Sequence, residues 1–285
     1  MTNVLEGLQS QERIAARKLF DAFDRARNRN PITLGDRQII QPSESGELNA
    51  ANPYARILLG NALWSEFSKF FDLSESQPIP EVPLFWLTLV DLGCMTALDA
   101  TNINVAGMIR HLRIGLRGLS YIGLMEAALY ANIQPATNYP ERTGVNWHLH
   151  LFAWGEEPKA MKLRVKRMNK ASENHRPIVP RDMGGVGFES RRVTEENIAR
   201  RFRYMCKTPR KAYRINVKKR MDAEGRTEFS YISSKSLLRP GERVTLFHLL
   251  KNFSLDELTV AGGEGVGLRR RALRHLVRPS GSHHR

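Results

Sequence analysis

The chain has 285 residues, of which 41% are hydrophobic and 26% charged, the balance of a soluble globular protein with a sizeable core. No apolar run approaches the ~20 residues that span a bilayer, and the N-terminal stretch lacks an apolar signal segment, so we expect a cytoplasmic protein with no membrane partner. The two cysteines, Cys94 and Cys206, stand far apart outside any CxxC pattern. This spacing indicates a reducing compartment and no structural zinc.

The net charge of +15 is concentrated in one segment. Residues 159–220 hold 20 of the 44 Lys and Arg but only 5 of the 29 Asp and Glu, so the rest of the chain is neutral. Such a local excess is the electrostatic footprint of a polyphosphate partner. A solvated basic stretch is the plainer alternative, but helical periodicity within the segment favours a nucleic-acid partner.

The first 80 residues form a region of their own. Apolar residues recur at helical spacing over residues 4–29 and again over residues 54–73, and a polar, Pro-rich connector follows at residues 74–83. We therefore expect an N-terminal helical region over residues 1–80, which could serve dimerisation or DNA docking.

From residue 84 strands and helices alternate. The pattern predicts strands at residues 84–92, 120–131, 146–155 and 184–193, and helices at residues 104–119, 157–171 and 194–207. The order β-α-β-β-α-β-α suits an α+β domain with a small antiparallel sheet over residues 81–220.

Residues 221–285 are predicted to form a C-terminal extension. It contains a short strand at residues 228–234, a helix at residues 243–253 and a Ser254/Glu257 capping box. The Gly-rich stretch "GGEGVGLRR" has no leading strand, so we interpret it as a loop, and the basic end is expected to be loose.

Two histidines stand one residue apart in "GVNWHLHLFAWG". Because side chains at i and i+2 of a strand share a face, His148 and His150 lie close enough to hold one ion. Phe152 and Trp154 share that face, where they could stack on bases or pack in the core.

Glu126 is the candidate third ligand. It lies on the apolar face of the strand at residues 120–131, where a carboxylate is costly unless it is paired or bound to a metal. The alternative is an exposed glutamate, or one paired with an arginine. Two imidazoles and a carboxylate suit Mn²⁺ or Mg²⁺ in the presence of phosphate, with Zn²⁺ or Fe²⁺ also open.

Other sequence patterns exclude several classes of enzyme. The sequence has no HExxH zinc-peptidase motif and no GxxxxGK[ST] loop, so it contains no P-loop NTPase or helicase module. His111 lies between arginines on a predicted helix and His248 on an apolar helix face, and both are interpreted as structural.

The helix at residues 194–207 presents a tyrosine among cations. Its apolar stripe places Tyr204 on the opposite side, with Lys207 and Arg200 one turn away. We therefore expect a phenol directed away from the core, with cations that favour the phenolate and bind phosphate. The alternative is an exposed tyrosine that touches only the DNA backbone.

Three motifs follow one another along the chain: a strand "LFWLTL", then "WHLHLF", then "RYMCK". Their order resembles that of the HUH endonucleases, most closely the replication initiator (Rep) proteins of rolling-circle plasmids and phages. The resemblance covers residues 84–215. It implies a ferredoxin-like or RRM-like palm with the histidine pair on a central strand, a divalent ion and a covalent 5′-phosphotyrosine. Carried over by position, Tyr204 is the nucleophile, His148, His150 and Glu126 are metal ligands, and Lys207 assists.

The resemblance also implies a substrate and partners. It implies nicking and joining of single-stranded origin DNA at the start of rolling-circle replication, with a helicase supplied in trans by a bacterial host. We expect DNA contacts from basic side chains near these motifs, namely Arg200, Arg203, Lys162, Lys166, Arg167, Arg210 and Lys211.

The chain departs from the family at the second strand transfer. Some Reps carry a second tyrosine four residues from the first, or a glutamate four residues before it, where this chain has Arg200. Tyr213 lies nine residues after Tyr204 and beyond Pro209, which makes it a poor second nucleophile. An HUH transposase or relaxase, a non-catalytic nucleic-acid-binding regulator and a hydrolase of small phosphoesters remain alternatives, although the last does not explain the localised charge.

Overall fold

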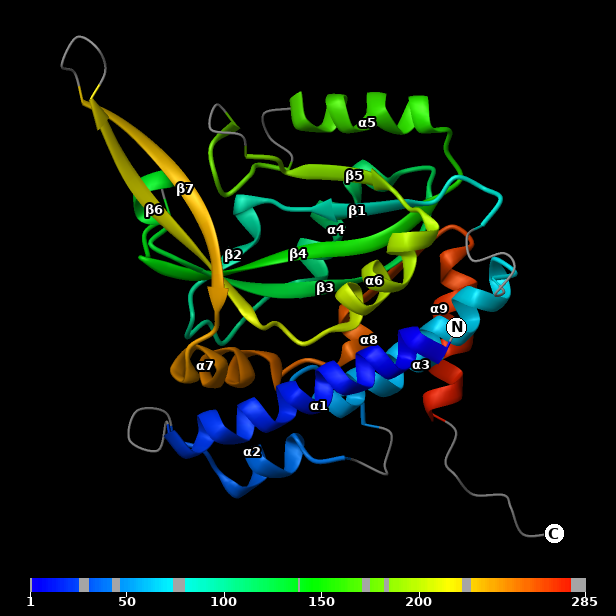
Figure 1. Cartoon of the computed structure of the whole chain (residues 1–285), viewed down its shortest axis with the longest axis horizontal. Coiled ribbons are helices and arrows are strands. Elements are labelled where there is room, and N and C mark those ends of the chain that lie inside the picture. The colour runs from blue at the N-terminus through cyan, green and yellow to red at the C-terminus, as the bar shows by residue number, and fades with distance from the viewer. Residues whose placement is uncertain are drawn as a thin grey trace.

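The computed structural model shows a twisted mixed sheet with helices on both faces (Figure 1). It describes residues 2–25, 31–42, 47–73, 80–137, 139–170, 175–181, 185–221 and 227–277. No helix within these ranges is long and apolar enough to cross a membrane.

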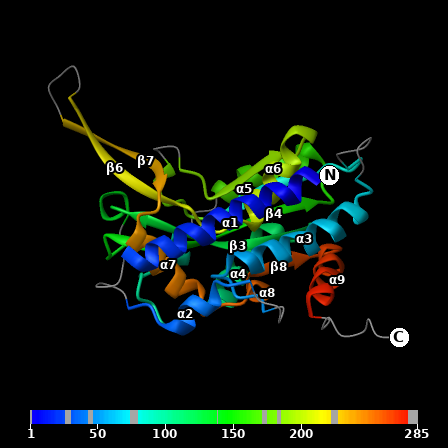
Figure 2. The ribbon, with the colours of Figure 1, turned by 60° about the horizontal axis from the view of Figure 1, so that its bottom comes forward.

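Three helices precede the sheet: α1 (Thr2–Arg25), α2 (Leu34–Ile39) and α3 (Pro53–Phe70). The two long ones confirm the predicted helical periodicity, and they pack against each other (Figure 2). Pro53 occupies the first turn of α3, and the Asn52 side chain accepts a hydrogen bond from the Tyr54 N–H. The short α2 was not predicted; a capping box between Thr33 and Asp36 starts it.

The predicted order of strands and helices is confirmed from residue 84 onward. The elements are β1 (Phe85–Leu89), β2 (Met95–Thr96), α4 (Val105–Leu112), β3 (Ser120–Ala131), β4 (Thr143–Trp154), α5 (Pro158–Lys170), β5 (Phe188–Arg192) and α6 (Glu195–Cys206), with 3-10 turns at Leu92–Cys94, Arg113–Leu116 and Gln134–Ala136. Strands β5-β1-β4-β3 lie side by side and every neighbouring pair is antiparallel. The chain is therefore an α+β protein, as predicted.

The C-terminal part corrects several predictions. Strands β6 (Lys211–Met221) and β7 (Thr227–Leu237) form a hairpin that enlarges the sheet, and β6 runs parallel to β3 at two positions, so the sheet is mixed. The predicted sheet was too small because β6 was not recognised: Tyr213, Ile215 and Val217 alternate with polar residues, but the strand also holds five Lys and Arg. Helix α7 (Pro240–Leu250) and the capped turn α8 (Leu255–Leu258) confirm the two predicted features between residues 243 and 257.

The Gly-rich stretch is not a loop. Strand β8 (Thr259–Gly262) pairs with β3, and α9 (Gly265–Val277) begins within the glycines. Leu268 and Ala272, 1% and 0% exposed, anchor α9 in the core, and the helix packs against α3. This apolar spacing within an arginine-rich run explains why the segment is helical where a loose end was predicted. The last part of the predicted loose end, residues 278–285, lies outside the described residues.

A continuous apolar core joins the N-terminal helices to the sheet. The Phe67 ring of α3 lies 5.1 Å from Phe152 of β4 and 5.9 Å from Phe202 of α6. Phe152 and Trp154 are 0% and 3% exposed, so they pack in the core and are not open to bases. Thus α3 and α6 cover the face of β4 that carries the histidines, while α4 lies behind the sheet (Figure 1).

Candidate metal centre and tyrosine pocket

Strand register brings the three predicted ligands together. Glu126 of β3 lies directly opposite His148 of the antiparallel β4, and His150 follows two residues on along the same face. Both strands are central in the sheet, so all three side chains are largely enclosed, with exposed fractions of 13%, 4% and 5%. The predicted ligand set is therefore a spatial cluster.

The distances between the ligand atoms fit a small divalent ion. Glu126 Oε2 lies 3.0 Å from His150 Nε2 and 3.7 Å from His148 Nε2, and the two Nε2 atoms are 3.0 Å apart. An octahedral ion with bonds of about 2.1 Å holds adjacent ligand atoms about 3.0 Å apart. Glu126, His148 and His150 can therefore hold one divalent ion.

The second ring nitrogens of the histidines are held by their own partners. His148 Nδ1 lies 3.4 Å from the Asn146 carbonyl oxygen, which can only accept, so His148 donates from Nδ1. His150 Nδ1 lies 3.1 Å from the Thr88 hydroxyl. With Nδ1 protonated, His148 presents the lone pair of Nε2 to the carboxylate, and His150 does the same when its Nδ1 donates to the Thr88 hydroxyl. A cation stabilises this arrangement, which is typical of metal-bound histidines.

The electrostatics give the ligands the protonation states that a metal requires. Burial lowers the pKa of His148 to about 3, and it lowers the pKa of His150 as well. Burial alone would raise the pKa of Glu126, but the Lys207 ammonium and the two imidazoles outweigh it and hold that pKa well below its usual value. At neutral pH the site thus offers two neutral imidazoles and a carboxylate.

Tyr204 leans over this cluster. Its ring centroid lies 4.9 Å from the His150 ring and 6.0 Å from Trp86, which itself stacks on His150. The phenol was expected to point away from the core, but α6 packs across the sheet face that carries the histidines, and the half-buried Tyr204 packs against the His150 ring while it also lines a pocket with Arg200 and Lys207.

The acidity of Tyr204 also differs from the prediction. Burial, the Glu126 carboxylate and a hydrogen bond with Tyr213 raise the pKa of Tyr204, whereas nearby cations were expected to favour the phenolate. The phenol is therefore protonated at neutral pH when no cation occupies the cluster.

Lys207 joins the tyrosine to the metal ligands. Its Nζ lies 2.8 Å from Glu126 Oε1 and 3.9 Å from the centroid of the Tyr204 ring. The residue at the C-terminal end of α6 thus neutralises the glutamate and contacts the phenol at the same time.

A pocket of about 310 Å³ opens beside Tyr204 and Glu126. Six cationic side chains line it: Arg200, Arg203, Lys207, Arg210, Lys211 and Lys235. Four of the predicted DNA contacts are therefore gathered here. The other three, Lys162, Lys166 and Arg167, are exposed on α5 beside β5, at the far edge of the sheet, and do not line the pocket (Figure 1).

No protein-family model, curated protein or solved structure matches the chain. What the site can do chemically follows from its own geometry. An ion-binding triad, a phenol, a lysine and a ring of cations meet in one pocket, the combination needed to bind a phosphodiester and attack it.

The N-terminal helices hold the end of α6 in place. The buried Arg56 of α3 donates to the carbonyls of Cys206 and Lys207, and the buried Glu12 of α1 accepts from the backbone and hydroxyl of Thr208. These contacts span 150 to 196 residues of sequence, so sequence reasoning missed both residues.

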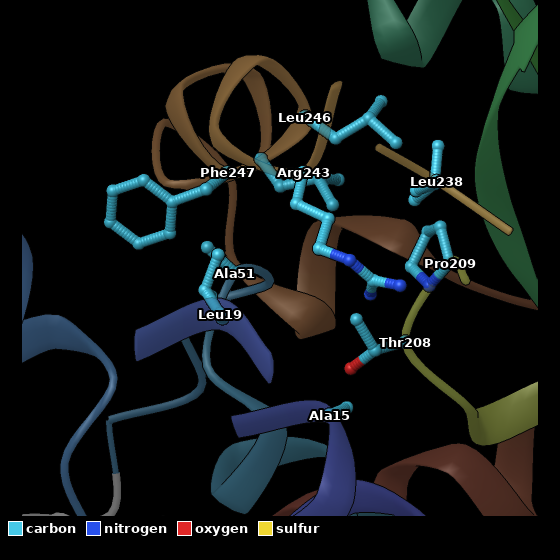
Figure 3. Close-up of a pocket in the computed structure, with 10 residues that line it drawn as sticks. Ala15, Leu19, Ala51, Thr208, Pro209, Leu238, Arg243, Leu246 and Phe247 are labelled. Carbon is cyan, nitrogen blue, oxygen red and sulfur yellow. The ribbon is translucent and has the colours of Figure 1, made fainter. Parts of the chain in front are cut away.

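The loop after α6 is also enclosed by apolar groups. Thr208 and Pro209 line a small cavity with Ala15 and Leu19 of α1 and Leu246 of α7 (Figure 3). The enclosure fixes the backbone just beyond Lys207. Arg243 and the Thr208 hydroxyl are its polar lining groups, and the other lining side chains are apolar (Figure 3).

Tyr213 reaches the pocket from β6. The parallel register of β3 and β6 places it beside Tyr130, on which its ring stacks with centroids 4.5 Å apart, and it is close enough to Tyr204 to help raise the pKa of that phenol. The sequence predicted a poor second nucleophile because Tyr213 lies beyond Pro209, but the chain turns directly into β6 and Tyr213 lines the pocket of Tyr204.

The two histidines interpreted as structural lie outside this pocket. His111 Nε2 lies 3.0 Å from the buried Asp91 carboxylate. His248 lies on α7, half-buried beside Phe247.

Proposed function

We propose that this chain nicks and rejoins single-stranded DNA and so initiates rolling-circle replication, as its resemblance to the Rep proteins of the HUH superfamily implies. One observation carries the proposal: the Tyr204 ring lies 4.9 Å from the His150 ring of the metal-ligand cluster, in a pocket lined by cations. A small-phosphoester hydrolase does not need a cationic lining on this scale.

The topology of the sheet supports the family assignment. Strands β5-β1-β4-β3 are antiparallel neighbours, and the helices α4 and α5 connect strands that are not adjacent. This order supports the ferredoxin-like palm that the resemblance implies. The histidine pair lies on β4, the inner strand expected for it.

Glu126, His148 and His150 are the residues that would hold the ion, for which we propose Mn²⁺ or Mg²⁺. When bound, such an ion polarises the non-bridging oxygens of the scissile phosphate. The remaining tasks fall to side chains of the pocket.

In the proposed reaction the Tyr204 Oη attacks the phosphorus in line. The Oη–P bond forms, the bond from phosphorus to the 3′ oxygen breaks, and the phenol proton is lost as the 3′ oxygen gains one. The products are a 5′-phosphotyrosine and a free 3′-hydroxyl, and attack by a 3′-hydroxyl on the phosphotyrosine rejoins the strand.

Lys207 and the pocket arginines supply charge where it is needed. The Lys207 Nζ, 3.9 Å from the Tyr204 ring centroid, offsets negative charge that develops on the attacking oxygen and the phosphate. Arg200 and Arg203, both on α6, line the pocket and would hold neighbouring phosphates of the strand.

A covalent-adduct assay tests this proposal. A pool of random single strands carries the label at the 3′ end, because the 3′ fragment stays on the protein, and is incubated with protein and Mn²⁺. We expect a labelled protein band that resists denaturing electrophoresis in wild type and in the remote control Tyr54→Phe, and no band in Tyr204→Phe. An equal band in Tyr204→Phe contradicts the proposal, and tight binding with no band in wild type indicates the non-catalytic regulator.

A further inference from the structure

Strands β6 and β7 form an arm that leaves the body of the protein. They pair over their whole length, from Lys211↔Leu237 to Met221↔Thr227, but β3 pairs with β6 only at Tyr213 and Arg214. The seven pairs beyond that point have no other strand beside them in the described part of the chain, and both views show them projecting from the sheet (Figures 1 and 2). At about 3.4 Å per residue this free part is about 24 Å long.

Beyond Ile215, which is 1% exposed and packs against the body of the protein, the described side chains of the free part are largely exposed. Val217, Met221 and Ile232 are 44%, 73% and 40% exposed, and Asn216 and Thr227 are exposed as well. An isolated two-stranded hairpin is marginally stable in water, so an arm of this length contributes little to the stability of the fold. Its exposed surface is better explained by a partner that it binds.

The composition of the arm fits a duplex nucleic acid. Lys218, Lys219 and Arg220 follow one another on the free part of β6, and the facing strand is rich in Ser and Thr. Hydroxyl and cationic groups are the side chains that contact DNA phosphates and base edges. A two-stranded β-ribbon is also one of the two elements that fit the major groove of B-DNA.

The root of the arm lies at the tyrosine pocket. Lys211, Tyr213 and Lys235 belong to β6 and β7, and all three line the pocket that holds Tyr204. A duplex held along the arm therefore ends where the single strand must enter.

We infer that the β6–β7 arm binds duplex DNA beside the single-stranded segment that enters the tyrosine pocket, an inference that rests on the proposed function for the role of that pocket. A second copy of the chain could instead pair with the free strand edges. The run of lysines and arginine disfavours it, because two copies would bring like charges together and lysines on an edge strand oppose edge-to-edge pairing.

The test compares two DNA probes in the Tyr204→Phe background, which prevents covalent trapping. One probe is a fluorescent hairpin with a single-stranded flank, and the other is an unstructured strand of equal length. The arm variant is Lys218→Ala/Lys219→Ala/Arg220→Ala. The control, Lys69→Ala/Arg270→Ala/Arg274→Ala, removes three exposed cations near α3 and α9, on the opposite side of the molecule (Figure 1).

We expect the arm variant to weaken hairpin binding at least tenfold and to lower the slope of log K against log salt by about 3, since each duplex phosphate that the protein no longer neutralises removes about 0.9. Its affinity for the unstructured strand should stay within twofold, and the control should match its parent on both probes. Unchanged hairpin binding, or equal weakening on both probes, would overturn the inference. So would an arm variant that turns a dimer into a monomer in sedimentation while hairpin binding persists.

The outcome is separable from that of the proposed function. Hairpin binding that depends on the arm supports the inference even if wild type forms no adduct on any strand. In that case only the proposed nicking activity is rejected. An adduct on the unstructured strand, with hairpin binding indifferent to the arm, leaves the nicking activity and removes the arm's role.

Discussion

Glu126 uses its two carboxylate oxygens for different purposes. Oε2 faces the Nε2 atoms of His148 and His150, while Oε1 accepts from Lys207 Nζ at 2.8 Å. One buried side chain thus links the metal-ligand cluster to the residue that contacts Tyr204. A buried carboxylate is costly unless it is paired, and here both of its oxygens have partners.

Removing the two imidazoles should abolish tight metal binding. In His148→Ala/His150→Ala only Glu126 is left of the three ligands, and we expect the Mn²⁺ affinity to fall more than about 100-fold, since loss of outer-shell partners alone costs about 10–100-fold. Isothermal titration calorimetry measures the effect. The control is His111→Gln/His248→Gln, which should bind Mn²⁺ as wild type does, and equal affinity in both double variants would refute the site.

His175 gives the fold a pH dependence of its own. The side chain is 0% exposed, neither ring nitrogen has a hydrogen-bond partner within the described residues, and burial lowers its pKa from 6.5 to about 4. As the pH falls below 6.5, the imidazole of His175 is protonated in the unfolded chain but stays neutral in the native protein. The group's contribution to the free energy of unfolding is therefore present above pH 6.5 and is lost as the pH falls towards 4.

The variant His175→Asn should remove that contribution. Asparagine tolerates the positive φ of 52° at this position and does not titrate. We expect the fall in unfolding free energy between pH 6 and pH 4 to be shallower than in wild type by up to about 1.4 kcal/mol per pH unit. Urea unfolding at three pH values measures it, and parallel curves for the two proteins would contradict the assignment.

The sequence predicted the ligands better than their surroundings. The ligand face of β4 followed from strand alternation, and Glu126 from the cost of a carboxylate on an apolar face. Tyr213 was discounted because Pro209 separates it from the helix of Tyr204, and Thr88 and Arg56 were missed because each acts through a contact with a distant part of the chain, which no local pattern encodes. The raised pKa of Tyr204 was missed for the same reason, since it depends on the Glu126 and Tyr213 that α6 meets only after folding.

At the scale of elements, α1 and α3 position the end of α6. Arg56 and Glu12 fix the backbone from Cys206 to Thr208, and Lys207 lies between them with its side chain on Glu126. A helix end usually leaves its last carbonyls to water, whereas here a buried guanidinium satisfies two of them. The N-terminal helices therefore act on the site through its backbone.

This account predicts a positioning effect for Arg56→Lys, which keeps the charge but loses the planar fork of donors. We expect adduct formation to slow about 10–100-fold, since displacements near 1 Å at a reacting group have effects of that size. Mn²⁺ affinity should stay within twofold because the ligands lie on β3 and β4. The matched control is Arg37→Lys in the exposed pair with Asp24, and an Arg56→Lys rate equal to wild type at full Mn²⁺ affinity would contradict the positioning role.

Helices and strands were predicted wrongly where the burial of a segment does not match its sequence pattern. β6 combines five Lys and Arg with a short alternation of Tyr213, Ile215 and Val217, and β7 pairs with it along its length. α9 begins in glycines and contains an arginine run, yet two small or apolar positions reach the core. Strands β3 and β4, whose apolar residues lie on both faces, were located within a few residues of their observed ends.

At the scale of the whole molecule, the excess charge falls on several surfaces. The pocket collects six cations, the arm continues the basic run, and α5 carries Lys162, Lys166 and Arg167 at the far edge of the sheet. The three surfaces suggest a nucleic acid that extends beyond the pocket. The whole charge excess could be predicted from the sequence, but its division among surfaces required the fold.

The variant Lys162→Ala/Lys166→Ala/Arg167→Ala tests how much α5 contributes to DNA binding. For a long single strand we expect the slope of log K against log salt to fall by about 2, because each single-strand phosphate that the protein no longer neutralises removes about 0.7. Adduct formation at saturating DNA should be unchanged, because none of the three residues lines the pocket. An unchanged salt slope would remove α5 from the DNA-binding surface.

The central claim is that Tyr204 becomes covalently attached to DNA, and the chain allows that tyrosine to be identified directly. Trypsin cuts after Arg203 and Lys207 to release Tyr-Met-Cys-Lys, and it cuts after Lys211 and Arg214 to release Ala-Tyr-Arg, which contains Tyr213. Mass spectrometry of the nuclease-trimmed, Mn²⁺-dependent adduct should find the nucleotide on Tyr-Met-Cys-Lys. A nucleotide found only on Ala-Tyr-Arg, or on neither peptide, would contradict the claim.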